Sequence, residues 1–437
     1  MILKKGQIIE LKNQRSLLVD DFLGAGGQGE VYLVTCDNQK YALKVYIHPT
    51  STDFKYNLKN NIDRKTPSKN FLWPLEIVDL AGGRYGYLMD LRPQNYKSFI
   101  SFLNGQVRFK NTYTLIKWCI ELCLSFKKLH EKGFSYQDLN DGNFFFEPDT
   151  GKLLICDNDN VTADKKNLGV LGKMKYMAPE IVRGDKDPVT GNLQMPDIHS
   201  DRFSLAIILF MALCLGNPFE GERLKSYDFI DEQAELELYG TNPVFVYHKT
   251  NKTNRPIRGY HSSVLKRWAY LPLYIKEAFH KTFVDGLNDR ENQRTNELEW
   301  IRLLCKYRDE LITCNCGYQY PYGFEEKNVY ENCPSCNSVS KTICSLKIGK
   351  HVITLEPGKN IFRHHVDKYS SEYNEIVGTV IANKNNPNLW GIRLNLDYDV
   401  EIEDAFNNRK IVKKDGVIPI VKNLTITLEE NTKAIIE

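Results

Sequence analysis

The chain has 437 residues, of which 42% are hydrophobic and 26% are charged, and its formal net charge is +3. This composition is that of an ordinary globular protein, and the length predicts several domains rather than one core. The small net charge excludes the strongly basic surface that nucleic-acid binders carry, so nucleic acid is not an expected partner.

Targeting segments are not expected. The N-terminus "MILKKGQIIELKNQR" lacks the apolar core of a signal peptide, and the longest apolar run, "FSLAIILFMALCL" from 203, is too short to cross a bilayer. We therefore expect a cytoplasmic protein that does not enter a membrane. In that compartment, the 11 cysteines indicate free thiols or metal ligands rather than disulfides.

Three patterns follow one another along the chain. Residues 16 to about 92 alternate short β-like runs with turn residues and hold one predicted helix near 54–63. From about 96 to 308 the spacing is mostly helical, and "DRFSLAIILFMALCLG" is apolar on nearly every face, as in a buried helix. Beyond 345, short β-like runs predict a small β-sandwich.

A glycine-rich stretch lies in the first region. "LGAGGQGEVYLV" places Gly24, Gly26 and Gly29, followed by Val31, between two β-like runs. Such spacing alone is as often a flexible turn as a phosphate-binding loop. In a dinucleotide-binding fold a helix would follow, whereas this stretch continues as strand, turn and strand. The second of those strands, "YALK", carries Lys44.

Polar motifs then follow in a fixed order. Asp138 and Asn143 stand in "QDLNDGN", Asp157 stands in "LLICDND", and "YMAPE" occupies 176–180. A polar turn after a helix is the plain alternative for "QDLNDGN". The ordered set, taken with the glycines and Lys44, resembles the protein kinase family over roughly residues 16–308. The resemblance implies a bilobal α+β kinase fold that transfers phosphate from ATP to Ser or Thr of a protein substrate, whose identity the sequence does not give.

The resemblance also implies roles for these residues. Lys44 would contact the α- and β-phosphates of ATP, and the glycine backbone would close over them. Asp138 would be the base that accepts the substrate hydroxyl proton, and Asn143 and Asp157 would hold Mg²⁺ or Mn²⁺. Their residue types suit these roles, because hard cations prefer oxygen ligands. The remaining expected ATP-site residues are Val31, Ala42, Met89, Asp90 and Leu91.

Three further residues match the scaffold of the family. Glu180 ends the "YMAPE" motif, and Arg294 stands where kinases place the arginine that pairs with that glutamate. Asp201 matches the aspartate at a helix start that braces the catalytic loop, and we expect it to act as an N-cap.

Some positions depart from the family pattern. Tyr136 and Gln137 replace the usual His-Arg, which leaves no arginine there to receive an activation-loop phosphate. The sequence Asp157-Asn158-Asp159 replaces Asp-Phe-Gly, so a phenylalanine that helps to set active and inactive states is missing.

The small lobe lacks an expected partner for Lys44. Between Lys44 and Leu75 there is no glutamate, so the usual lysine–glutamate pair is missing or replaced by an aspartate such as Asp53 or Asp63. This departure leaves two hypotheses open. The first is an active kinase, which the intact motif set favours, and the second is a pseudokinase scaffold that binds nucleotide or partners without phosphate transfer.

Two further departures concern the cation that contacts the γ-phosphate. The lysine that usually follows the catalytic aspartate by two residues is Asn140 here, and Lys173 stands where a threonine is usual. By resemblance these two side chains lie near each other, so Lys173 could supply the cation that contacts the γ-phosphate. The alternative is a solvated activation-loop charge.

Four cysteines are spaced as metal ligands. Cys314 and Cys316 form one pair, and Cys333 and Cys336 form a second pair in "CPSC". Two close pairs separated by a short hairpin predict a tetrahedral structural zinc site, and the alternative is unligated thiols. All four positions would be thiolates, so the ion would stabilise a small domain rather than catalyse.

The last region resembles a divergent forkhead-associated domain, which usually binds phosphothreonine. Gly358-Lys359 and His364-His365 only loosely match the binding residues of that family, so a packing role is favoured over phosphopeptide binding. The predicted domains are a kinase domain at 1–308, with lobes at about 16–92 and 93–308, a zinc ribbon at 309–342 and a sandwich at 343–437. This order resembles bacterial kinases of stress and tellurite-resistance loci, and the resemblance implies a metal-dependent phosphatase and a von Willebrand-type protein as partners.

Overall fold

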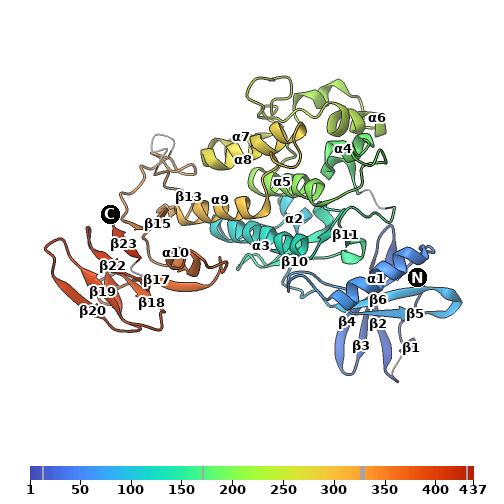
Figure 1. Cartoon of the computed structure of the whole chain (residues 1–437), viewed down its shortest axis with the longest axis horizontal. Coiled ribbons are helices and arrows are strands. Elements are labelled where there is room, and N and C mark those ends of the chain that lie inside the picture. The colour runs from blue at the N-terminus through green and yellow to red at the C-terminus, as the bar shows by residue number, and fades with distance from the viewer. Residues whose placement is uncertain (12–13, 170–171, 325–329, 430–431) are drawn as a thin grey trace. The chain divides into compact units, whose positions relative to one another are not determined.

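The computed structural model describes residues 1–11, 14–169, 172–324, 330–429 and 432–437 (Figure 1). The chain divides into two compact units. The first comprises 1–110, 117–269 and 276–301, and the second comprises 111–116, 270–275 and 302–437. Within the described ranges, no helix combines the length and apolarity that crossing a membrane requires.

The first unit begins with an antiparallel six-stranded sheet in the order β1-β2-β3-β4-β6-β5. The strands are β1 (Ile8–Glu10), β2 (Ser16–Ala25), β3 (Gly29–Cys36), β4 (Gln39–Tyr46), β5 (Glu76–Asp79) and β6 (Tyr85–Asp90). Alternate residues of a strand face opposite sides, and β4 accordingly places Leu43 and Val45 in one hydrophobic cluster and Ala42 and Tyr46 in another. Strand β1, which precedes the predicted lobe boundary at residue 16, was missed by the sequence pattern.

Helix α1 (Thr52–Arg64) packs on one of these clusters through Phe54 and Leu58. The side chain of Ser51 accepts a hydrogen bond from the backbone N–H of Phe54, which caps the helix at its N-terminus. The helix predicted near 54–63 is therefore confirmed. It extends two residues further at its N-terminus and one residue further at its C-terminus.

The rest of the first unit is mainly helical. Helix α5 is buried almost throughout, as its apolar sequence predicts, and Gly133 ends α3 with a positive φ of 71°. The helices between residues 99 and 309 are α2 (Phe99–Leu103), α3 (Thr112–Glu131), α4 (Pro179–Arg183), α5 (Ile198–Cys214), α6 (Glu232–Glu235), α7 (Ser262–Ala269), α8 (Leu273–Phe283) and α9 (Glu297–Asp309). The first residues of α3 and α8 and residues 302–309 of α9 belong to the second unit.

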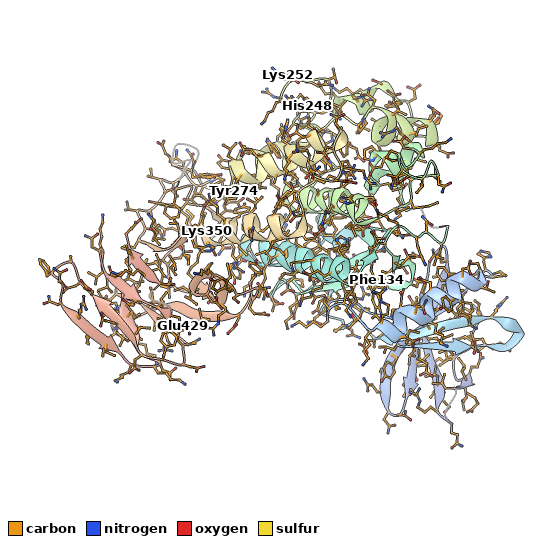
Figure 2. All side chains as sticks on the ribbon, viewed as in Figure 1. Phe134, His248, Lys252, Tyr274, Lys350 and Glu429 are labelled. Atoms are coloured by element: carbon orange, nitrogen blue, oxygen red, sulfur yellow. The ribbon has the colours of Figure 1, made fainter. Side chains whose placement is uncertain are left out.

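Short strands hold two loops of this unit beside each other. Strand β8 (Phe134–Ser135) pairs with β11 (Thr162–Ala163), while β9 (Phe144–Phe146) pairs with β10 (Leu153–Ile155) and with β7 (Lys97–Ser98). Phe134, labelled in Figure 2, is buried at the start of the first loop. These ladders fix residues 136–143 next to residues 156–161, and these two loops carry the predicted catalytic motifs.

The second unit contains a hairpin and two antiparallel sheets. The hairpin is β12 (Leu311–Thr313) with β13 (Gln319–Pro321), and the sheets have the orders β15-β14-β23-β22-β19-β20 and β16-β17-β18-β21. Their strands are β14 (Ser345–Ile348), β15 (His351–Thr354), β16 (Asn360–Phe362), β17 (Ile376–Ala382), β18 (Trp390–Leu394), β19 (Val400–Glu403), β20 (Arg409–Val412), β21 (Val417–Pro419), β22 (Thr425–Thr427) and β23 (Lys433–Ile436).

Residues from both of these sheets share one hydrophobic core, which includes Ile353, Val380, Ile392 and Ile426. This arrangement is compatible with the predicted sandwich. A short helix, α10 (Arg363–Val366), lies in a region where the sequence indicated only strands. The first unit, with its sheet and helices, has the mixed α/β content of the predicted bilobal kinase fold, and the proposed domain boundaries stay a prediction.

Candidate active site

Lys44 is buried in β4 and contacts two carboxylates. Its Nζ donates to Asp159 at 3.1 and 2.9 Å and also to Asp157 Oδ1. Burial alone would lower the pKa of Lys44, but the charges of Asp159 and Asp157 outweigh it and raise that pKa. The lysine is therefore held as a cation in the interior of the first unit.

Asp159 takes the position of the missing small-lobe carboxylate. It is fully buried, and its Oδ2 also accepts a hydrogen bond of 2.7 Å from the Tyr46 hydroxyl. The expectation that Asp53 or Asp63 replaces the glutamate is wrong, because both side chains lie on the exposed side of α1. The second aspartate of "DND", where the family has glycine, was the sequence signal for this pairing.

Asp157 has a backbone conformation that few residues other than glycine adopt. Its φ of 58° and ψ of 50° lie in the left-handed region. Burial and the neighbouring Asp159 raise the pKa of Asp157, while Lys44 lowers it. The surrounding contacts thus hold its carboxylate at the Lys44 amine in spite of the backbone cost.

Asp138 lies in the loop after β8, among side chains of the same loop. Asn143 donates to the backbone oxygen of Asp138 at 2.8 Å, and Asn140 donates to its Oδ1 at 3.0 Å. Burial raises the pKa of Asp138, whereas Asn140 and the charges of Lys173 and Lys44 lower it, and the net shift is upward. A raised pKa makes this carboxylate a better proton acceptor.

Asp201 braces that loop, as expected, but it is not the N-cap. Its two carboxylate oxygens accept the backbone N–H groups of Tyr136 at 2.6 Å and Gln137 at 3.1 Å. The cap of α5 is Asp197, which accepts from the backbone of the first helical turn and forms a capping box with Ser200. Because Asp201 stands four residues further on, inside the helix, its carboxylate is free to reach the loop.

His130 was missed by the sequence analysis. One ring nitrogen lies 3.0 Å from Asp201 and the other lies 3.0 Å from Glu297. Burial would lower the pKa of His130, but these two hydrogen bonds raise it to about 9. The imidazolium therefore links the last turn of α3 to the aspartate that braces the catalytic loop, and nothing in its sequence neighbourhood indicates this role.

Gln137 connects the catalytic loop directly to the segment that follows Asp157. Its amide nitrogen donates to Ser135 at 3.2 Å and also to the Thr162 hydroxyl and the Lys166 carbonyl. In the usual kinase pattern an arginine stands at this position and holds the segment by binding a phosphate group on it. Here the neutral amide of Gln137 holds the segment without a phosphate.

The predicted nucleotide residues meet on the small-lobe sheet. Val31, Ala42, Met89 and Leu91 belong to one apolar cluster, and Asp90 ends strand β6 beside them. An apolar surface of this kind suits a flat aromatic base.

The three glycines differ in what they require. A Cβ on Gly29 would meet the Val45 carbonyl oxygen at 2.6 Å, so the close strand pairing requires glycine there. A Cβ on Gly24 or Gly26 would meet no atom within 4 Å. The backbone at these two positions is thus open to an approaching phosphate.

Glu180 and Arg294 form a buried bidentate ion pair. The two guanidinium nitrogens lie 2.8 and 2.7 Å from the two carboxylate oxygens. Burial raises the pKa of Glu180, but Arg294 outweighs burial and lowers it. The pair fastens α4 to the segment before α9.

Lys173 is exposed, and its positive charge contributes to lowering the pKa of Asp138. It is therefore close enough to the catalytic loop to act on it electrostatically.

The four predicted zinc ligands converge in the second unit. Cys314 Sγ lies 3.6 Å from Cys336 Sγ, and Cys316 Sγ lies 3.7 Å from Cys333 Sγ. A tetrahedral ion with Zn–S bonds of about 2.3 Å would place its sulfurs about 3.8 Å apart, so the cysteines fit zinc without rearrangement.

Of the residues that loosely matched a phosphothreonine site, Gly358 is exposed, whereas Lys359, His364 and His365 are buried. Lys359 donates to the carbonyls of Arg308 at 2.9 Å and Leu311 at 2.7 Å, and burial lowers its pKa to about 8. His364 is 6% exposed and His365 is 4% exposed. These side chains are therefore not at the surface, where a phosphopeptide would bind.

Comparison with known proteins agrees with the first unit. The family model "Protein kinase domain" matches residues 18–284, which is more than half of the chain. The chain therefore belongs to the protein kinase family.

Curated relatives are Ser/Thr kinases of low identity. "Ribosomal protein S6 kinase alpha-6" from Danio rerio is 26% identical over 217 residues, which cover 46% of this chain and 27% of that protein. "Serine/threonine-protein kinase AtPK1/AtPK6" from Arabidopsis thaliana is 25% identical over 249 residues, covering 51% of this chain and 50% of the relative. The chain thus spans half or less of the length of these relatives, which support the Ser/Thr class of protein kinase.

Proposed function

We propose that this chain is a protein kinase that transfers the γ-phosphate of ATP to a Ser or Thr hydroxyl of a protein partner. The observation that carries the proposal is the assembly of Lys44, Asp157 and Asp159, beside the loop that holds Asp138 and Asn143. A chain without catalytic function has no physical need to hold these carboxylates and this amine together, since burying them costs free energy.

The residues would divide the work as follows. Lys44 would bind the α- and β-phosphates, and the backbone of the glycine loop would close over them. Asn143, whose amide nitrogen is engaged by the loop, keeps its oxygen for a cation, and Asp157 supplies a carboxylate. A bound Mg²⁺ or Mn²⁺ would supply charge compensation on the phosphates. Asp138 would accept the hydroxyl proton while the hydroxyl oxygen bonds to the γ-phosphorus and the bond to the β-phosphate oxygen breaks.

The pseudokinase alternative is based on the absent small-lobe glutamate. The buried Asp159 weakens this alternative, because it supplies the carboxylate for Lys44 from the magnesium loop itself. One consequence is that lysine positioning would not depend on movement of α1. The active site of such a kinase would assemble without an external signal.

Phosphate transfer from γ-labelled ATP to a generic protein substrate, or to the chain itself, tests the proposal. The wild type should transfer label, Asp138→Asn should transfer almost none, and Asp159→Leu should lose activity while Asp53→Ala retains it. The last variant is the matched control, since Asp53 is the exposed aspartate once expected to pair with Lys44. Binding of ATP without transfer by the wild type would instead support the pseudokinase.

The second unit supports proposals of its own. We propose a structural zinc ion on Cys314, Cys316, Cys333 and Cys336, supported by their sulfur spacing, and a sandwich of the forkhead-associated type that packs rather than binds phosphopeptide. A role in bacterial stress response, with a metal-dependent phosphatase and a von Willebrand-type protein as partners, is supported by the sequence resemblance alone. Co-purification of the chain with either partner from its host would test that role.

A further inference from the structure

A second group of metal-ligand side chains lies outside both sites described so far. In the part of the chain that the structure describes, two groups of His, Cys, Asp or Glu converge closely enough to hold an ion. One is the cysteine cluster, and the other consists of Asp309, His351, His364 and His365, whose ligand atoms lie within 4.8 Å of one another. The second group comes from the end of α9, the start of β15 and α10, all within the second unit.

His364 is buried without the partners that a buried imidazole normally has. It is 6% exposed, and neither ring nitrogen has a hydrogen-bond partner among the described residues. Buried polar groups nearly always have a hydrogen-bond partner, because an unsatisfied donor or acceptor is destabilising. An imidazole nitrogen with no hydrogen-bond partner can offer its lone pair to a metal ion, and the ligand atoms of His364, His351 and Asp309 lie within 4.8 Å of one another.

Asp309 supplies one free carboxylate oxygen to the same place. Its Oδ2 lies 2.9 Å from His365 Nε2, while its Oδ1 has no hydrogen-bond donor among the described residues. Arg308 Nε is 3.7 Å from Oδ1, beyond hydrogen-bond length, and its Nη1 donates to the Tyr373 carbonyl at 3.0 Å. The carboxylate is thus buried, and its Oδ1 has no hydrogen bond from any described residue.

His365 has a different role from His351 and His364. Its Nδ1 accepts the backbone N–H of Phe362 at 3.1 Å, so Nε2 carries the proton that is donated to Asp309. Both of its nitrogens are engaged, and it orients the carboxylate in the way that outer hydrogen-bond partners orient metal ligands.

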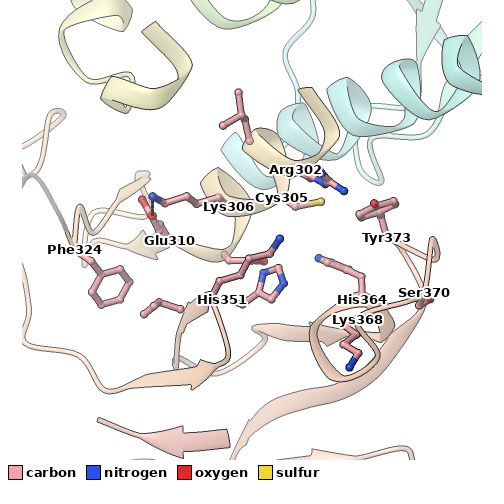
Figure 3. A pocket seen from close by; sticks show the side chains of 14 residues that line it. Arg302, Cys305, Lys306, Glu310, Phe324, His351, His364, Lys368, Ser370 and Tyr373 are labelled. Carbon is pink, nitrogen blue, oxygen red and sulfur yellow. Dashed lines mark ion pairs between the residues drawn. The ribbon is translucent and has the colours of Figure 1, made fainter. Parts of the chain in front are cut away.

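The group opens on a cavity of about 350 Å³. His351 and His364 both line this cavity (Figure 3), and the centroids of their rings are 5.6 Å apart. Cys305, Lys350 and Tyr373 contribute to the remaining walls. A site with a cavity on one side leaves a coordination position open, whereas a closed structural site does not.

We propose that His351, His364 and Asp309 bind a divalent transition-metal ion of the zinc class, with His365 positioning Asp309 and the fourth position facing the cavity. Two imidazoles and one carboxylate are a common ligand set for zinc and for other first-row metals. This ion would be distinct from the ion on the four cysteines, which lacks an open position.

Metal content of the purified full-length chain tests the site. The protein is equilibrated with Zn²⁺, passed over a chelating resin and analysed by mass spectrometry for metal. His364→Phe keeps a ring of similar size against Tyr373 and removes the lone pairs, so this variant should hold one ion fewer per chain than the wild type. His48→Gln, at an exposed histidine of the small lobe, is the matched control and should retain the wild-type content.

Two further measurements separate this site from the cysteines. The double variant Cys333→Ser with Cys336→Ser should lose the ion of the cysteine cluster and keep one ion. Adding His351→Asn to this double variant should remove the remaining ion. Co²⁺ bound to the double cysteine variant should show the weak absorption of nitrogen and oxygen ligands, without the intense sulfur-to-metal band. Equal metal content in the wild type and His364→Phe would overturn the proposal and make these histidines a packed, metal-free cluster.

Discussion

At the scale of single residues, carboxylates and cations have changed position relative to the usual kinase pattern. Asp159 pairs with Lys44 in place of a helix glutamate, and Gln137 replaces an arginine that would require a phosphate. In both cases the replacing residue belongs to the catalytic loop or to the magnesium loop itself. The local ladder of β8 with β11 keeps these loops in register, so the partners are held without an additional element.

Replacing Lys173 tests whether its positive charge assists phosphate transfer. If its amine contacts the γ-phosphate during transfer, Lys173→Ala should lower turnover by roughly a hundredfold, a contact worth on the order of 3 kcal/mol, with little change in ATP binding. Steady-state kinetics measures both quantities. Lys166→Ala, in the same segment, is the control, and Asn140→Lys with Lys173→Thr should restore part of the rate. Wild-type turnover by Lys173→Ala would make it a solvated charge.

At the scale of elements, buried ion pairs join helices that the chain connects only distantly. Arg294 fastens α4 through Glu180, and His130 at the end of α3 joins Asp201 of α5 and Glu297 of α9. Each pair holds the catalytic loop or the segment after it, so the helices serve as the rigid support of the site.

The His130 contact predicts a pH dependence of stability. The pKa of His130 is raised to about 9 in the folded chain, above its unfolded value of about 6.5. The protonated histidine therefore stabilises the fold fully below about pH 6.5, and this contribution is lost as the pH rises through about 9. Urea unfolding of the wild type and His130→Gln should differ by about 3 kcal/mol near pH 6, and the difference should shrink toward pH 10.

A control histidine distinguishes this effect from general alkaline destabilisation. His248, labelled in Figure 2, is about half-buried, its ring accepts hydrogen bonds from the backbone N–H groups of Thr250 and Asn251, and it lies 5.8 Å from the His280 ring. His248→Gln should follow the pH profile of the wild type. A difference between wild type and His130→Gln that stays constant over this pH range would show that His130 is neutral in the folded protein.

At the scale of the whole molecule, the chain has two compact units with separate cores. The predicted nucleotide residues all belong to the first unit, and both candidate transition-metal sites belong to the second. Ligands of the two units should therefore stabilise different parts of the chain, because a ligand stabilises only the structure that forms its site.

Hydrogen exchange can resolve this difference. ATP with Mg²⁺ at a hundred times its dissociation constant should stabilise the first unit by about 2.7 kcal/mol, seen as slower exchange in β4 and α1. Residues 345–437 should exchange at unchanged rates, and Asp157→Ala should show much less protection than the wild type. Equal protection of Asp157→Ala would remove Asp157 from cation binding.

The sequence by itself determined the order of chemical motifs, the strand-rich and helical regions, the cysteine pairs and the match to a kinase domain. These follow from residue types at short, regular spacings, since alternation in strands, helical periodicity and paired ligands are local properties. Only the tertiary structure decided that Lys44 pairs with Asp159, 115 residues away, that Asp197 rather than Asp201 caps α5, and that His130 reaches Asp201. It also decided that three histidines and Asp309 meet beside one cavity. Such contacts depend on how whole elements pack. A local pattern that repeats every two or four residues does not specify which distant side chain the packing brings near.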